Sequence, residues 1–170
     1  MARTVPAARI RLAHAQARKL LDECAITSAP VNVKKIARHT GARLAYEAFP
    51  AKDGISGVLL RKKTGAVIVI NDDDYDVRQR FSIAHEIGHL VLHDDDVHID
   101  YRDARAATGA EPREVEANAF AAELLMPSAL LRTEGTVRAG DDDVIQKLAK
   151  KYDVSAAAMS WRLTNLGLLQ

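Results

Sequence analysis

RQRFSIAHEIGHLVLH, the stretch at residues 78–93, decides the fold, because its apolar side chains lie on nearly every face of a helix. A helix that is apolar all round is buried among other elements. We therefore predict a helix over Val77–His93 at the centre of the domain. The four aspartates within Asn71–Asp76 come directly before it, where negative charge favours a helix N-terminus.

Two histidines and a glutamate interrupt this apolar helix at the spacing HExxH, as His85, Glu86 and His89. Side chains four residues apart share a helix face, so both imidazoles can bind one metal ion. Burying the three polar groups without partners would cost several kcal/mol, and a metal ion removes that cost. Glu86 projects about 100° away from His85, toward the side where a water ligand would lie. The pattern predicts a zinc site at which Glu86 accepts a proton from water.

A third protein ligand must come from further along the chain. The downstream candidates are His93, Asp94, Asp95, Asp96, His98, Asp100, Glu111, Glu114, Glu116 and Glu123. We favour Glu114, because it shares a face of the predicted helix Arg113–Met126 with Asn118, which can accept a hydrogen bond from a ligand imidazole. We expect His93 to be a cation at the end of its helix and Glu116 to face solvent.

The remaining periodicity predicts an α+β fold. Further helices are predicted over Pro6–Cys24, after Pro30, and over Asp142–Tyr152 and Ala156–Leu166; strands are predicted over Arg43–Tyr46, Ile55–Leu60 and Ala66–Ile70. We expect these strands to form a small, mostly antiparallel three-stranded sheet packed on helices, and residues 94–112 to form a loop. Residues 1–140 are predicted to form the main domain, and residues 141–170 a helix-turn-helix-like pair packed on it.

The composition narrows the class of protein. The 170 residues carry a net charge of +1 and only 5% aromatic side chains, which gives no reason to expect a nucleic-acid surface. Cys24, the only cysteine, excludes an internal disulfide and a cysteine-based zinc site, and we expect it to be buried. The chain has no apolar run that could span a membrane and no signal-peptide core. We expect a cytoplasmic protein.

Four segments in this order resemble the ImmA/IrrE family of metallopeptidases: residues 54–57, 67–71, 78–89 and 114–127. The resemblance implies a zincin-like fold and a zinc-dependent endopeptidase with one ion per chain. It places the metal ligands at His85, His89 and Glu114, and the catalytic glutamate at Glu86. It also implies that the substrate is a helix-turn-helix repressor, whose cleavage relieves repression in a stress or DNA-damage response or during induction of a phage or mobile element. Mn²⁺ or Fe²⁺ also suits two histidines and a glutamate.

Zincins commonly bind a substrate peptide as an added strand at a sheet edge. We expect Ile55–Leu60 to be that edge, since Gly57 would let another backbone approach. Tyr75, Tyr101 and His98 are candidates for a second oxyanion donor, although each is expected to lie at the surface.

The alternative function is a DNA-binding or partner-binding regulator with a metal site that does not hydrolyse peptides. Its phosphate contacts would come from Lys147, Lys150, Lys151 and Arg162. A helix that reads bases carries basic or amide side chains at its N-terminal end, but residues 156–158 are alanines. Direct nucleic-acid binding is therefore not expected. We expect Trp161 to be a buried anchor of the core or of an interface.

Overall fold

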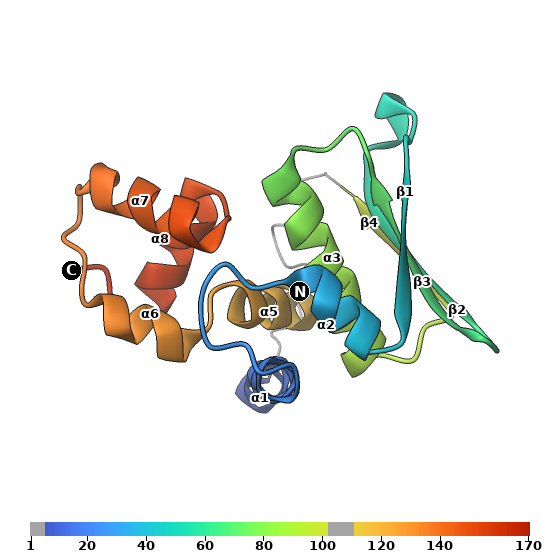
Figure 1. The fold of residues 1–170 in the computed structure, drawn as a ribbon, viewed down its shortest axis with the longest axis horizontal. Coiled ribbons are helices and arrows are strands. Elements are labelled where there is room, and N and C mark those ends of the chain that lie inside the picture. The colour runs from blue at the N-terminus through green and yellow to red at the C-terminus, as the bar shows by residue number, and fades with distance from the viewer. Residues whose placement is uncertain (1–5, 102–110) are drawn as a thin grey trace.

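The computed structural model describes residues 6–101 and 111–170, and in this part of the chain seven α-helices lie on one side of a four-stranded sheet (Figure 1). The helices are α1 (Ala7–Glu23), α2 (Val33–His39), α3 (Asp76–Leu92), α5 (Pro112–Leu125), α6 (Ser128–Glu134), α7 (Asp142–Tyr152) and α8 (Ala156–Asn165). The strands are β1 (Ala42–Glu47), β2 (Ile55–Lys62), β3 (Gly65–Asn71) and β4 (Val97–Tyr101), and η1 (Ala51–Asp53) is a 3-10 helix. The predicted α+β class is confirmed.

The sheet differs from the prediction of three mostly antiparallel strands. Its strand order is β1-β3-β2-β4, with β1 parallel to β3 and the other pairs antiparallel. The chain reverses direction between β1 and β2, through η1, and reverses again between β2 and β3. Strands β1 and β3 therefore run in the same direction and pair in parallel. β4 lies within the predicted loop over residues 94–112. The sequence did not reveal this strand, because its inward-facing residues are the polar Asp100 and His98 rather than apolar side chains. The rest of that predicted loop, at residues 102–110, lies outside the described residues.

Helix α3 is central, as predicted. It packs between the inner face of the sheet and α5 (Figure 1), and every residue from Ser82 to His89 is buried. Gly88 allows α5 to approach closely, since a Cβ atom there would lie 3.2 Å from the Cα atom of Ala117. The helix that carries the HExxH motif is therefore fixed on two sides.

The C-terminal end of α3 is held by Arg61 of β2. The last carbonyl groups of a helix have no partner within it. The Arg61 guanidinium donates hydrogen bonds to the carbonyls of His89 at 3.1 Å and Leu90 at 2.8 Å, and to that of His93. This contact ties the end of the motif helix to the sheet.

The C-terminal pair α7–α8 packs on the rest of the chain through a buried ion pair. Arg162 of α8 is 2% exposed and pairs with Glu123 of α5, and its Nε atom donates to the carbonyl of Met126 at 3.1 Å. Trp161 beside it is 56% exposed, so it is not an anchor of the core, and the alternative of an interface anchor stays a prediction. The division of the chain at residue 140 stays a prediction.

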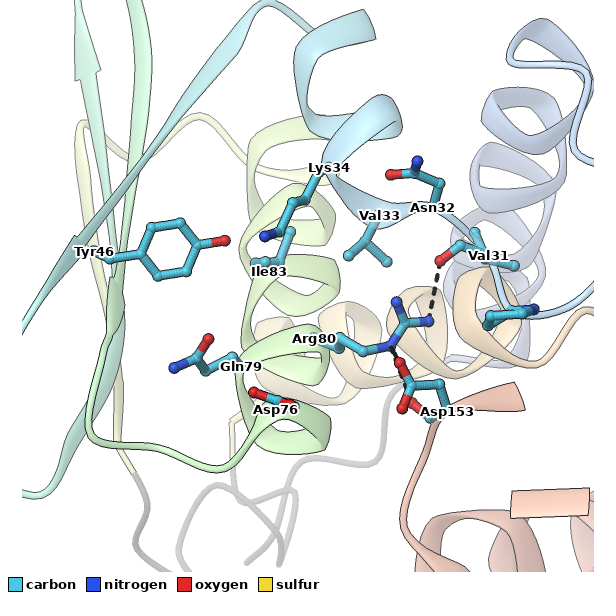
Figure 2. A pocket seen from close by; sticks show the side chains of 11 residues that line it. Val31, Asn32, Val33, Lys34, Tyr46, Asp76, Gln79, Arg80, Ile83 and Asp153 are labelled. Carbon is cyan, nitrogen blue, oxygen red and sulfur yellow. Dashed lines mark hydrogen bonds and ion pairs between the residues drawn. The ribbon is translucent and has the colours of Figure 1, made fainter. Parts of the chain in front are cut away.

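A hollow of about 480 Å³ lies between α2, α3, β1 and the turn from α7 to α8 (Figure 2). Arg80 crosses it, with its Nε atom 3.0 Å from the carbonyl oxygen of Asp153 and its Nη2 atom 3.0 Å from that of Val31. None of the predicted site residues lines this hollow. In the described parts of the chain, no helix has the length and apolarity needed to cross a membrane.

Candidate metal centre

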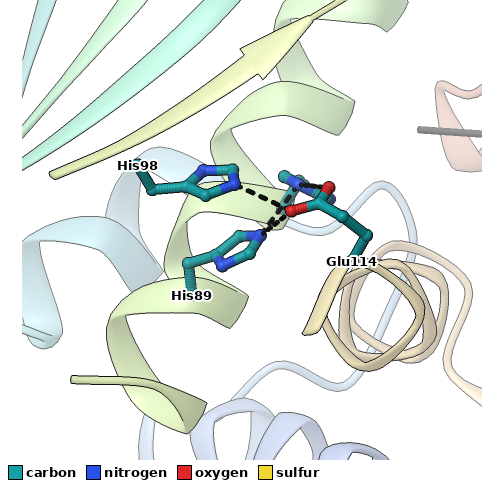
Figure 3. A group of neighbouring side chains, drawn as sticks. His89, His98 and Glu114 are labelled. Carbon is teal, nitrogen blue, oxygen red and sulfur yellow. Dashed lines mark hydrogen bonds and ion pairs between the residues drawn. The ribbon is translucent and has the colours of Figure 1, made fainter. Parts of the chain in front are cut away.

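Four side chains from three elements converge at the middle of α3. His85 and His89 come from α3, Glu114 from the first turn of α5, and His98 from β4; one ligand atom of each lies within 4.8 Å of all the others (Figure 3). The two carboxylate oxygens of Glu114 lie 3.2 Å from the Nε2 atoms of His85 and His89. The structure thus brings together the three residues predicted as metal ligands.

Both helix histidines have a hydrogen-bond partner on the ring nitrogen that faces away from the cluster. The Nδ1 atom of His85 donates to the side-chain oxygen of Asn118 at 3.0 Å, as the spacing of Glu114 and Asn118 predicted. The Nδ1 atom of His89 lies 3.0 Å from the Nδ1 atom of His93. The Nε2 atoms of His85 and His89 therefore face each other across 3.1 Å and point into the cluster.

His98 joins the cluster, although its sequence position suggested a surface residue. Its Nε2 atom donates to Glu114 at 2.8 Å and its Nδ1 atom to Glu86 at 3.0 Å, while its ring stacks on that of His89 at 3.4 Å between centroids. Burial lowers the pKa of His98, but the two carboxylates outweigh it and raise that pKa to about 10. The alternation of β4, which turns His98 and Asp100 inward, was the sequence signal that could have placed it.

Glu86 is fully buried beneath β2 and beside the cluster. Burial raises its pKa above the ordinary range of a glutamate, against the opposing pull of His98 and His85. Gly57 lies directly over this carboxyl group: a Cβ atom there would be in ordinary van der Waals contact with the Glu86 side chain, at 3.5 Å. The prediction that Ile55–Leu60 is a sheet edge is wrong, because β2 lies between β3 and β4. Among the strands that the structure describes, the edge beside the cluster is β4.

The cluster is arranged around a positive charge. Burial lowers the pKa of His89 to about 4, which keeps this ring neutral. Burial also opposes charge on His85, yet Glu114, Asp100 and Glu86 raise its pKa above the ordinary value. The surrounding imidazoles hold the pKa of Glu114 below its usual range despite its burial. The site therefore combines the ionised carboxylate of Glu114 with the neutral ring of His89, while the neighbouring carboxylates favour positive charge at His85 and His98.

Two further residues occupy places that the sequence did not predict. Glu116, which we expected to face solvent, is 4% exposed, and His93 is 5% exposed between it and His89. Partners from other elements compensate their burial: Arg9 of α1 pairs with Glu116, which also contacts His93. Burial lowers the pKa of His93 in spite of Glu116, which opposes the expected cation. Tyr75 and Tyr101 are at the surface, as expected, with exposed fractions of 86% and 47%.

Residues 29–164 match the sequence profile of a peptidase family described as the IrrE N-terminal-like domain. The radiation response metalloprotease IrrE of Deinococcus deserti is 32% identical over 153 residues, which cover 82% of this chain and 54% of that protein. The protein of the same name from Deinococcus radiodurans is 40% identical over 101 residues, covering 58% of this chain and 30% of that protein. The chain thus spans about half or less of the length of these relatives.

Among solved structures, a Mycobacterium tuberculosis transcriptional regulator superposes with a TM-score of 0.60 at 15% identity, over 91% of this chain and 46% of that one. This likeness shows a shared fold alone. The family match covers most of the chain, and the chain therefore belongs to the IrrE N-terminal-like domain family of peptidases. The resemblance to ImmA/IrrE proteins that its motifs indicated is confirmed.

Proposed function

We propose that this chain is a zinc-dependent endopeptidase in which His85, His89 and Glu114 hold one zinc ion and Glu86 is the catalytic base. The observation that carries the proposal is the convergence of two Nε2 atoms and a carboxylate beside a buried glutamate. Mn²⁺ and Fe²⁺ are the other ions that this set of donors suits.

The donor set fits a metal ion. With Nδ1 of His85 donating to Asn118 and Nδ1 of His89 held by His93, each neutral ring turns a lone pair into the cluster. Two lone pairs 3.1 Å apart, with a carboxylate 3.2 Å from each, repel one another unless a cation lies among them. Two imidazoles and one carboxylate are the protein ligands of many catalytic zinc sites.

When bound, zinc supplies Lewis acidity that polarises a peptide carbonyl and eases deprotonation of the attacking water. Glu86 accepts the proton of that water and delivers it to the leaving amine, a task suited to a buried carboxyl with a raised pKa. His98 lies between Glu86 and Glu114, with one ring nitrogen within hydrogen-bond distance of each carboxylate. If Glu114 bound a metal ion, the Nε2–H group of His98 would be free to turn to the substrate, and we assign to this group the second hydrogen bond to the developing oxyanion.

The edge strand β4 offers a place for an extended substrate peptide. His98 of this strand points into the cluster, whereas Val97, Ile99 and Tyr101 alternate with it and are 55%, 37% and 47% exposed. A peptide that adds to a sheet edge forms backbone hydrogen bonds and presents alternate side chains to the protein. Binding along β4 would carry the scissile bond past His98 and the metal ligands, in the manner of a zincin-like peptidase.

The proposed substrate is a helix-turn-helix repressor in the cytoplasm, whose cleavage relieves repression in a stress or DNA-damage response or in phage or mobile-element induction. This part of the proposal rests on the family resemblance and on relatives named radiation response metalloproteases. Cleavage must then be selective, because a peptidase that acts among cytoplasmic proteins cannot cut them freely.

The alternative, a DNA-binding regulator, is less well supported. Of its four basic residues, Arg162 is buried in the ion pair with Glu123, and Lys151 pairs with Glu134 at 2.6 Å. Helix α8 begins with the exposed residues Ala156 and Ala157, which offer no hydrogen bonds to base edges. A duplex-binding assay at two salt concentrations distinguishes the classes, since phosphate contacts give a steep salt dependence. Sequence-selective binding with such a slope would revive the regulator.

The test of the enzymatic proposal compares four proteins: the parent, Glu86→Gln, Glu114→Gln and the control Glu111→Gln, which changes an exposed carboxylate at the N-terminal end of the same helix. Zinc content and dissociation constant are measured first, and then cleavage of repressors encoded beside the gene and of casein. We expect Glu86→Gln to bind zinc without cleaving, Glu114→Gln to lose both zinc and cleavage, and the control to match the parent. Parental zinc affinity in Glu114→Gln would exclude Glu114 as a ligand, and rapid multi-site digestion of casein would contradict selective cleavage.

His98→Gln separates two roles for His98. A donor to the oxyanion predicts zinc affinity close to the parental value with greatly reduced cleavage. A loss of zinc binding comparable to that of Glu114→Gln would instead make His98 a fourth protein ligand.

A further inference from the structure

A second layer of polar residues lies behind His89. His93 follows α3 directly, with an extended backbone that turns its ring back under the helix. Its Nδ1 atom lies 3.0 Å from Nδ1 of His89, and its Nε2 atom lies 3.2 Å from a carboxylate oxygen of Glu116. The ring therefore bridges a ligand histidine and a buried acid.

Glu116 is itself fixed from a distant part of the chain. Arg9 of α1 binds both of its oxygens, with Nε at 2.9 Å and Nη2 at 2.6 Å, in the paired geometry that suits guanidinium and carboxylate. The two residues are 107 positions apart in sequence. Arg9, Glu116, His93 and His89 thus form a continuous chain of contacts from the surface of α1 to the metal cluster.

The donors and acceptors in this chain can be assigned by elimination. An ionised Glu116, paired with Arg9, only accepts hydrogen bonds, so the nitrogen of His93 that faces it carries the proton. The other nitrogen of a neutral His93 ring is then an acceptor. His89 must donate to it from Nδ1, which leaves the lone pair of His89 on Nε2, directed into the cluster.

We propose that His93, oriented by Glu116 and Arg9, is a positioning residue that fixes the tautomer and ring orientation of the metal ligand His89. Asn118 does the same for His85 from α5, so each helix histidine has its own acceptor. The inference rests on the proposed metal site and extends it to residues that neither the motif nor the family match assigns. Mutation of a residue that accepts a hydrogen bond from a metal-binding histidine typically lowers metal affinity about 10- to 100-fold.

The test uses variants that keep or remove the acceptor. In His93→Asn, the side-chain oxygen takes nearly the place of Nδ1, whereas His93→Leu retains apolar bulk without an acceptor. Ile87→Val is the control, because it trims a fully buried residue of α3 that takes no part in the hydrogen bonds of the cluster. Zinc dissociation constants are measured by competition with a chromophoric chelator, at a temperature where circular dichroism shows each protein to be folded.

We expect zinc affinity to fall about 10- to 100-fold in His93→Leu, to be largely retained in His93→Asn, and to stay parental in Ile87→Val. If His93 had only a structural role, zinc affinity would fall in step with the stability of the fold, and His93→Asn would lose as much affinity as His93→Leu. Parental affinity in His93→Leu, or equal losses in His93→Leu and His93→Asn, would overturn the proposal.

A second readout needs no activity. Long-range ¹H–¹⁵N spectra of the zinc-loaded parent should show the proton of His89 on Nδ1 and that of His93 on Nε2. A proton on Nδ1 of His93 would overturn the assignment. If the parent binds zinc through His85, His89 and Glu114 while the His93 variants behave as the parent, this inference fails and the proposed function stands. If the parent binds no zinc, both fail.

Discussion

Replacing Gly88 by alanine tests how closely the two helices that carry the proposed ligands must approach. Gly88 lies within the HExxH motif, and the added Cβ atom would meet Phe120 Cδ1 at 3.1 Å and the Cα and carbonyl oxygen of Ala117 at 3.2 Å. These separations are shorter than ordinary van der Waals contacts, and two of the three atoms belong to the α5 backbone. Helix α5 must therefore shift by a few tenths of an ångström to admit the methyl group.

Two opposing effects set the change in stability. Alanine favours a helix interior over glycine by about 1 kcal/mol. Overpacking a well-packed core costs about 1–3 kcal/mol, and the higher part of this range applies where backbone rather than a flexible side chain must yield. We expect a net decrease of about 1–2 kcal/mol in the free energy of unfolding, from the difference between these two effects.

The effect on the metal site should be larger than the effect on stability suggests. Glu114 lies one turn before Ala117 on α5, so a shift of this helix moves its carboxylate relative to His85 and His89. Functional groups must be held within about 0.5 Å of their productive positions. We expect zinc affinity to fall about tenfold. This is the lower end of the loss of metal affinity seen when a hydrogen-bond partner of a metal-binding residue is removed.

Urea denaturation of the zinc-free proteins and competition titrations with a chelator measure the two quantities. Ala15→Gly in the exposed middle of α1 is the control, because it reports the helix preference of alanine over glycine without a packing change. The reasoning is refuted if Gly88→Ala gains the stability that Ala15→Gly loses and binds zinc as tightly as the parent.

The remaining predictions concern the buried ion pair, the site and the metal. Arg162→Met removes the buried partner of Glu123 and leaves it only Ser128 and the half-exposed Arg18 at 3.5 Å. The free energy of unfolding should fall by about 3 kcal/mol, the lower end of the cost of breaking a buried ion pair, and the double variant with Glu123→Gln should recover part of this loss in urea denaturation. Arg162 and Ser128 hold the pKa of Glu123 below its usual value despite burial. Its ionised form therefore stabilises the fold above the unfolded pKa of about 4.3, and this contribution is lost as the pH falls through the lower, folded pKa. Glu123→Gln should accordingly show a shallower loss of stability in acid than the parent, and an identical acid profile would contradict the assignment. Gly57→Val should displace Glu86 and reduce cleavage more than zinc binding, whereas Gly57→Ala, at 3.5 Å from Glu86, should retain most activity. Free zinc at 100 times its dissociation constant should stabilise the parent by about 2.7 kcal/mol, and the same zinc should leave the thermal midpoint of Glu114→Gln unchanged.

The sequence by itself determined the features that depend on local spacing. The apolar faces of residues 78–93 required a buried helix, and the four-residue spacing of His85 and His89 placed both imidazoles on one side of it. The same spacing put Glu114 and Asn118 on one face of α5, and the structure places both against His85. Helical and strand periods are properties of neighbouring residues, so a single chain carries them completely.

Only the tertiary structure decided which polar residues are buried and which strand forms the edge. His98 and Asp100 looked like loop residues until β4 paired with β2, and Glu116 looked exposed until Arg9, 107 residues away, paired with it. In the strand order β1-β3-β2-β4, the edge strand beside the cluster is β4 and not β2 as the sequence had predicted. The physical reason is that burial of a charged or polar side chain depends on partners that compensate its desolvation, and here those partners come from elements far apart in the sequence.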